Sequence, residues 1–211
     1  MKTVFLDLDG TLTDSAEGIT SSINHSLMKL GYSTLDPTDM GWMIGPPLID
    51  TFTQLGVATP LEAVEHFRRQ YLTRGLYQNS LYPGILSAIN ELKAKQFSLV
   101  LMTSKPRETA QRITVHFGIA PYLLAVYGPK SDDTRCSKGD LLGQALSELK
   151  ADRMQSVMIG DRHYDFVAAS MNGVASIGVD WGYGTDDELS LASARCAKVA
   201  DLPISVQNLI P

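Results

Sequence analysis

Five short apolar runs along the chain predict buried β-strands, at residues 3–6, 98–102, 123–127, 156–159 and 175–179. The runs are continuous in apolar residues, as is typical of parallel strands that are covered on both faces. Stretches with helical periodicity follow most of them, at 107–117, 138–149 and 164–171. This strand–helix alternation predicts an α/β fold built on a doubly wound parallel sheet.

The segment between the first and second strands interrupts this alternation. It contains three helical stretches, at 17–30, 48–55 and 61–77, and no convincing strand. That is far more chain than an ordinary crossover between parallel strands needs. We therefore predict a small all-helical cap over residues 15–81, inserted after the first strand, and a core domain formed by residues 1–14 and 82–211.

Composition and charge exclude some classes of partner. The chain has 44% hydrophobic and 19% charged residues, and its net charge is -5, without a basic stripe that would neutralise nucleic-acid phosphates. Its apolar runs are too short to span a bilayer. The two cysteines, Cys136 and Cys196, do not have the spacing of a disulfide framework. We expect a cytoplasmic monomer or homodimer that binds neither a nucleic acid polymer nor a membrane.

Two carboxylates follow the first predicted strand. Asp7 and Asp9 are two residues apart, with Gly10 behind them to permit a sharp turn. A carboxylate is a competent nucleophile in phosphoryl transfer, so Asp7 is a candidate to attack phosphorus. Asp9 would then protonate the leaving oxygen and later activate water. The alternative for this pair is a capped turn before a helix.

Hydroxyl and amino groups follow the next two strands. Thr103 and Ser104 come after the second, where a hydroxyl can donate to a phosphate oxygen, although such a pair is also a common helix N-cap. Lys138 opens the helix after the third strand, where the helix dipole disfavours a cation. This position favours a functional role for Lys138, in which its ammonium neutralises Asp7 and a bound phosphate. The alternative is a solvated surface lysine. Lys130 and Arg135 are weaker candidates for the same role.

A second pair of acids, Asp161 and Asp165, follows the fourth strand. Oxygen ligands of this kind suit Mg²⁺, which takes one or two protein carboxylates together with substrate phosphate and water. Asp161 would bind the metal directly, and Asp165 would complete the metal site by orienting a bound water or Lys138. The alternative for Asp165 is a first-turn acid that favours the helix dipole. Since the carboxyl ends of parallel strands meet at one edge of a sheet, all these groups should converge there. The set predicts a Mg²⁺-dependent phosphatase with Asp7 as nucleophile.

At these residues the sequence resembles the haloacid dehalogenase superfamily of phosphohydrolases. Asp7 and Asp9 lie in its first motif, Thr103 matches the second, Lys138 the third, and Asp161 with Asp165 the fourth. The resemblance implies a Rossmann-like core with a helical cap of the C1 type. It implies an aspartyl-phosphate on Asp7, acid–base work by Asp9, and Mg²⁺ on Asp7, the Asp9 carbonyl and Asp161. Thr103 and Lys138 would hold the phosphate.

Three further segments, 44–48, 75–84 and 178–184, look like the phosphoglycolate phosphatase branch and its bacterial 5′-nucleotidase-like members. The implied substrate is a small phosphorylated metabolite, either a nucleoside 5′-monophosphate or phosphoglycolate. We expect the turn at Gly45 and Pro46 to contact it, unless this turn is only a rigid connection between helices. Trp42, Tyr77 and Tyr183 would stack on a base, or belong to the core.

Two other functions stay open on sequence grounds. A phosphomutase uses the same scaffold, and would isomerise a sugar phosphate without releasing phosphate. A receiver-like phosphorylation switch also combines acids, a hydroxyl, a lysine and Mg²⁺ on a doubly wound sheet. Receivers, however, are shorter, lack a cap and have no acid two residues after the phosphorylated aspartate.

Overall fold

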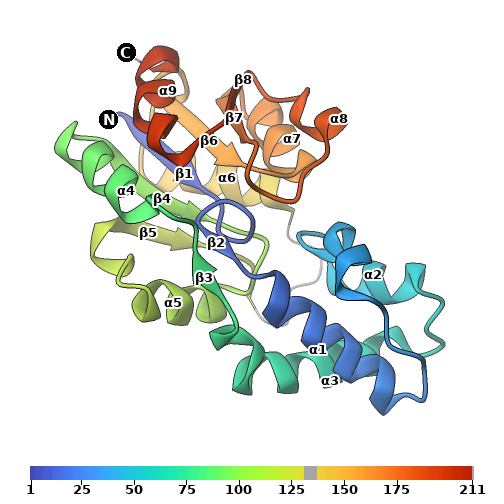
Figure 1. Ribbon diagram of the computed structural model, residues 1–211. Helices are drawn as coiled ribbons and strands as arrows, with labels where there is room; N and C mark the ends of the chain where they lie inside the picture. Colours follow the sequence, from blue (N-terminus) through green and yellow to red (C-terminus); the bar gives the residue numbers. More distant parts are fainter. Residues whose placement is uncertain (131–136, 211) are drawn as a thin grey trace. The chain divides into compact units, whose positions relative to one another are not determined.

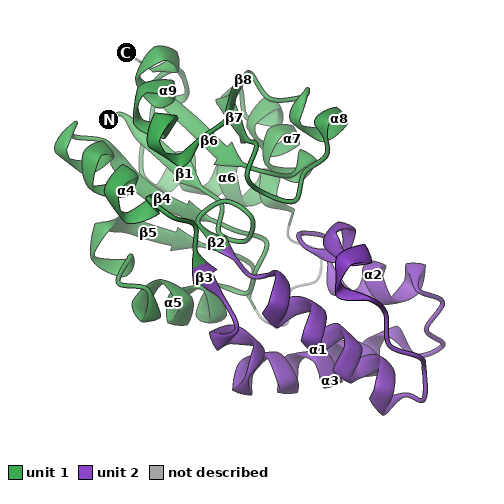
Figure 2. Ribbon diagram, in the orientation of Figure 1, with its two compact units in different colours: residues 1–13, 81–211 green, residues 14–80 purple. Residues whose placement is uncertain are grey.

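The computed structural model describes residues 1–130 and 137–210 (Figure 1). The chain forms two compact units (Figure 2). The first comprises residues 1–13 and 81–211, and the second comprises residues 14–80. The chain passes between the units twice, and at these crossings β2 (Thr13–Asp14) and β3 (Ser80–Leu81) form a two-stranded sheet.

The first unit contains a six-stranded parallel sheet in the order β5-β4-β1-β6-β7-β8. The predicted α/β fold with a parallel sheet is thus confirmed. A sixth strand, which the sequence analysis missed, is added at the edge beside β7. The bounds are β1 Thr3–Leu6, β4 Ser98–Met102, β5 Leu123–Tyr127, β6 Ser156–Gly160, β7 Ala175–Val179 and β8 Ala194–Cys196.

Helices cover the sheet on both faces. On one face, α6 and α7 pack against a core that includes Phe5, Met102 and Met158. On the other, α4 and α9 contact each other and the strands β4 and β7, and they lie in front of the sheet in Figure 1. The bounds are α4 Ile85–Ala94, α5 Arg107–His116, α6 Lys138–Glu148, α7 His163–Met171, α8 Asp186–Leu189 and α9 Leu202–Leu209, with 3₁₀ turns at Ala120–Tyr122, Arg153–Gln155 and Val199–Asp201.

The register of the central strand determines what meets at the edge of the sheet. Leu6, the last residue of β1, lies opposite Leu101 of β4 on one side and Ile159 of β6 on the other. Because the three strands are parallel and end together, the residues that follow them emerge at one edge. Those residues include Asp7, Thr103 and Asp161.

The second unit is mainly helical. Its helices are α1 (Ala16–Lys29), α2 (Leu48–Gln54) and α3 (Pro60–Thr73), with 3₁₀ turns η1 (Pro37–Asp39), η2 (Gly41–Met43) and η3 (Gly75–Tyr77). Helices α1 and α3 pack together, and α1 also contacts η3. A Cβ added at Gly18 would lie 2.0 Å from the carbonyl oxygen of Gly75, so only glycine permits the close approach of α1 to η3. In the described part of the chain no helix is long and apolar enough to cross a membrane.

Candidate active site

Asp7 is fixed by the end of the central strand. Its N–H donates to the carbonyl of Ile159 at 2.9 Å, and the residue is only 6% exposed. The turn that follows wraps around the carbonyl of Leu8, which accepts from the N–H groups of Leu12 and Thr13, both at 2.9 Å. Gly10 allows this turn to close, because its φ is +82° and a Cβ there would lie 2.1 Å from Asp161 Oδ2.

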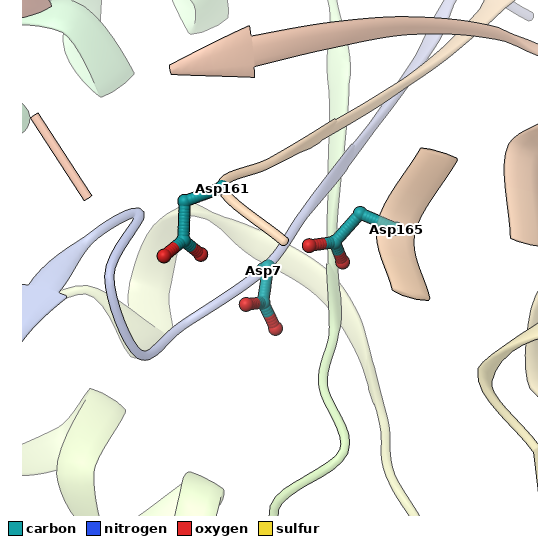
Figure 3. Close-up of side chains that lie close together, drawn as sticks. All are labelled: Asp7, Asp161 and Asp165. Atoms are coloured by element: carbon teal, nitrogen blue, oxygen red, sulfur yellow. The ribbon is translucent and has the colours of Figure 1, made fainter. Parts of the chain in front are cut away.

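Three buried carboxylates gather at this edge of the sheet (Figure 3). Asp7 follows β1, Asp161 follows β6, and Asp165 lies in the first turn of α7. One oxygen from each lies within 4.8 Å of the other two. The structure therefore brings together the acids that the sequence predicted at two separate strand ends.

Lys138 bridges two of these acids. Its ammonium lies 2.8 Å from Asp7 Oδ1 and 2.6 Å from Asp165 Oδ1, and its side chain is 6% exposed. Lys138 is the first residue of α6, a helix capped by Ser137, whose hydroxyl accepts from the Asp140 N–H at 3.1 Å. Burial opposes the charged ammonium, but the carboxylates of Asp165 and Asp7 outweigh it and raise the pKa of Lys138.

One ammonium is too little positive charge for three buried carboxylates. Burial, reinforced by the nearby charges of Asp165 and Asp9, raises the pKa of Asp7 to about 7 although Lys138 opposes the shift. Burial, together with the charges of Asp7 and Asp165, also raises the pKa of Asp161 well above its ordinary value. An all-oxygen donor set that lacks positive charge is what a divalent cation of the Mg²⁺ kind requires. The residues present therefore fit such an ion.

The orientation of Asp161 is set by two hydrogen bonds. Thr11 Oγ1 donates to its Oδ1 at 3.3 Å, and the Tyr183 N–H donates to its Oδ2 at 2.8 Å. Gly182 lies close enough that a Cβ there would be 2.3 Å from the Cβ of Asp161. The glycine-flanked turn at 182–184 thus holds this carboxylate, and Tyr183 contributes its main chain, a role that the sequence analysis did not foresee.

Asp165 has both carboxylate oxygens engaged. Oδ1 accepts from Lys138, and Oδ2 accepts from the Arg162 N–H at 3.1 Å. Gly160 leaves room for it, since a Cβ there would lie 2.1 Å from Asp165 Cγ. This geometry suits a residue that orients the Lys138 ammonium.

The side chains of Arg162 and His163 contact Glu188, a residue that the sequence analysis did not single out. Arg162 Nε lies 3.0 Å and His163 Nδ1 lies 2.6 Å from Glu188 Oε1. Glu188 also forms a capping box with Thr185 at the start of α8. Burial works against the charged carboxylate, but the bonds from His163, Thr185 and Arg162 prevail and lower the pKa of Glu188 to about 2. This cluster ties α8 to the loop that carries Asp161.

The loop after β4 carries the predicted hydroxyls. Thr103 is 1% exposed, and its Oγ1 accepts from the Lys105 N–H at 3.1 Å, which leaves the hydroxyl hydrogen available to donate. Ser104 is exposed. Lys105 reaches Asp9, with Nζ 3.2 Å from Oδ2. Lys105 has no role that could be predicted from the sequence, because a lysine before a proline indicates no particular chemistry.

The remaining candidates belong to the second unit, are exposed, or lie outside the described residues. Gly45 and Pro46 belong to the second unit, between η2 and α2, and their contact with substrate stays a prediction. Lys130 is exposed. Arg135 and Cys136 lie outside the described residues.

Comparison with known proteins identifies the family. Residues 4–179 match the haloacid dehalogenase-like hydrolases. The chain is 40% identical over 204 residues to a 5′-nucleotidase of Pseudomonas aeruginosa, covering 94% of this chain and 92% of that protein. It is 38% identical over 191 residues to the tyrosine-protein kinase PtkA of Mycobacterium tuberculosis, covering 90% of this chain but 66% of the kinase.

Comparison with solved structures supports the same family. A predicted phosphatase from Clostridium acetobutylicum superposes with a TM-score of 0.93 at 35% identity, covering 99% of each chain. The family match spans most of the sequence, and it includes the strands and turns that carry the acidic cluster. The chain therefore belongs to the haloacid dehalogenase-like hydrolase family and is a phosphatase of that family.

Proposed function

We propose that the protein is a Mg²⁺-dependent phosphatase that hydrolyses a small phosphomonoester through an aspartyl-phosphate on Asp7. The observation that carries the proposal is the buried cluster of Asp7, Asp161 and Asp165 with Lys138 between two of its members. Asp7 lies at the carboxyl edge of the sheet, where ligands bind in open α/β folds. Its neighbours supply both the positive charge and the oxygen ligands that phosphoryl transfer needs.

The reaction has two steps. In the first, a carboxylate oxygen of Asp7 forms a bond to phosphorus while the bond to the leaving oxygen breaks, and that oxygen takes a proton from Asp9. In the second, water attacks phosphorus, the bond to Asp7 breaks, and Asp9 takes the proton that the water loses. The products are an alcohol and inorganic phosphate, and Asp7 and Asp9 return to their starting states.

The remaining side chains bind the phosphate and orient the groups that contact it. Lys138 and the Thr103 hydroxyl donate to phosphate oxygens, and Asp165 holds Lys138 in place. Mg²⁺ would be held by Asp7, Asp161 and the carbonyl of Asp9, and when bound it neutralises charge on the phosphoryl group. Asp161 is pre-oriented for this task by Thr11 and Tyr183.

We further propose that residues 14–80 act as a cap that selects the leaving group and excludes water. The 40% identity to a 5′-nucleotidase favours a nucleoside 5′-monophosphate as the substrate. Phosphoglycolate is the alternative, supported by a phosphoglycolate phosphatase of Vibrio parahaemolyticus that is 26% identical over 204 residues. In this scheme the turn at Gly45 and Pro46 contacts the leaving group.

A panel of phosphomonoesters tests the proposal. Phosphate release is measured with nucleoside 5′-monophosphates, phosphoglycolate and an aryl phosphate, each with Mg²⁺ and with a chelator, and compounds are ranked by kcat/KM. Wild type should release phosphate only with Mg²⁺, and Asp7→Asn should be inactive. Activity that survives in Asp7→Asn, or a wild type inert toward the whole panel, would refute the proposal.

Transfer of the phosphoryl group to a hydroxyl of another protein is a second candidate function, because a tyrosine-protein kinase is among the relatives. A tyrosine oxygen would then take the place of water in the second step. The chain spans only 66% of that kinase, so the kinase has a further segment that this sequence does not match. The two functions are separated by supplying a radiolabelled phosphate donor and measuring how much label appears in inorganic phosphate and how much on protein.

A further inference from the structure

A buried ion pair joins Asp9 to a lysine from another strand end. Lys105 Nζ lies 3.2 Å from Asp9 Oδ2, and the two side chains are 8% and 12% exposed. Water screens a pair this deeply buried much less than an exposed one. Removing one partner leaves a buried charge without compensation, so the contact fixes the position of the Asp9 carboxyl group.

The two oxygens of Asp9 have different surroundings. Oδ2 faces Lys105, whereas Oδ1 is buried and has no hydrogen-bond partner among the described residues. A buried polar atom without a partner is costly, and native structures rarely keep one without a use for it. Oδ1 is therefore the Asp9 oxygen that the described residues leave without a partner.

The backbone places Lys105 in this position. The Thr103 N–H donates to the carbonyl of Tyr127 at 3.0 Å, and the Lys105 N–H donates to Thr103 Oγ1 at 3.1 Å. A Cβ added at Gly128 would lie 2.6 Å from the Lys105 carbonyl oxygen, so the next strand end packs tightly against this loop. The same loop thus carries both the Thr103 hydroxyl, a candidate phosphate-binding group, and the Lys105 ammonium that contacts Asp9.

We propose that Lys105 is a positioning residue for Asp9. Its ammonium holds Oδ2, so that Oδ1 is the atom that exchanges protons in both steps. As the bond from phosphorus to the leaving oxygen breaks, the proton on Oδ1 moves to that oxygen. When water attacks the aspartyl-phosphate and the bond to Asp7 breaks, Oδ1 accepts the proton from water. This role rests on the proposed phosphatase function.

The test varies how much the leaving group needs a proton. Release of p-nitrophenolate needs little protonation, whereas release of phenol from phenyl phosphate needs it strongly. Rapid mixing measures the first turnover of each compound in wild type, Lys105→Met and Lys105→Arg. Lys95→Met is the matched control, because Lys95 forms an exposed pair with Glu91 at 3.5 Å in the same unit.

Lys105→Met should slow phenol release about 10–100-fold, a large part of the contribution of a general acid. It should slow p-nitrophenolate release by much less and leave KM unchanged. Lys105→Arg should restore part of the rate on phenyl phosphate, and Lys95→Met should behave as wild type. Thermal unfolding checks that each variant is folded, and Lys105→Gln replaces Lys105→Met if the latter is not.

Equal slowing of both compounds would overturn the proposal, because the effect would then not depend on proton transfer. A rise in KM alone would also overturn it and would make Lys105 a phosphate-binding residue. A wild type that shows no Mg²⁺-dependent release of either compound would refute the phosphatase function itself. That failure is seen before any variant is compared, so it is distinct from a failure of the Lys105 role.

Discussion

Replacing Lys138 by methionine removes the only ammonium that the structure places between Asp7 and Asp165, among the described residues. The side chain keeps its length and apolar stem but loses contacts of 2.8 Å and 2.6 Å. Because the pair is buried, the two carboxylates would be left uncompensated, and breaking a buried pair typically costs about 3–5 kcal/mol. We expect Lys138→Met to lower the free energy of unfolding by about that amount in metal-free protein.

The structure offers a local reporter for this measurement. The two tryptophans lie in different units, Trp42 in the second and Trp181 in the first. Trp181 Nε1 donates to the carbonyl of Thr11 at 3.0 Å, and Thr11 lies in the turn that follows Asp7. In a Trp42→Phe background, urea unfolding followed by fluorescence therefore reports on the first unit alone.

Two comparisons make the measurement specific. Lys95→Met removes an exposed pair and should cost at most about 0.3–0.5 kcal/mol. In an Asp165→Asn background, Lys138→Met should cost less than it does alone, because one of the two stranded carboxylates is gone. If Lys138→Met costs no more than Lys95→Met, the ammonium does not hold the acidic cluster together and the electrostatic account is wrong.

Two further predictions concern residues that support the site. Gly10→Ala should abolish Mg²⁺ binding measured by calorimetry, because its φ is +82° and the new Cβ would collide with Asp161; unchanged binding would show that this turn does not shape the metal site. Glu188→Gln should lower stability at pH 7 by about 0.5–1 kcal/mol, given partial exposure. Since the pKa of Glu188 is lowered to about 2, its contribution is complete above about 4.5 and is lost as the pH falls toward 2. Thermal unfolding at pH 7 and pH 3 checks this, and a difference that grows at low pH would contradict it.

Much of the core could be predicted because buried parallel strands leave a clear trace in the sequence. Four of the five predicted strands have the predicted bounds, and β6 is one residue longer. Strand β8 was missed because it has only three residues and includes the exposed Arg195. A short edge strand with a charged residue has no continuous apolar run to mark it.

The candidate site also contains some residues that could be predicted from the sequence and others that could not. Asp7 and Asp161 could be picked out because they follow strands whose carboxyl ends meet at one edge of the sheet. Lys138 could be picked out because a cation in the first turn of a helix is unfavourable without a partner. Lys105 and Glu188 could not, since their partners are fixed by side-chain directions and by the position of α8. The hold of Tyr183 on Asp161 uses a backbone N–H, which every residue except proline has.

If the phosphoryl group passes through Asp7, an aspartyl-phosphate can be trapped on that residue. Wild type is mixed with substrate and Mg²⁺, quenched, and treated with borohydride, which reduces an aspartyl-phosphate to homoserine. Peptide mass spectrometry then reads the residue at position 7. We expect homoserine at position 7, and only when both substrate and Mg²⁺ are present. Steady phosphate release with unmodified aspartate at position 7 would contradict it.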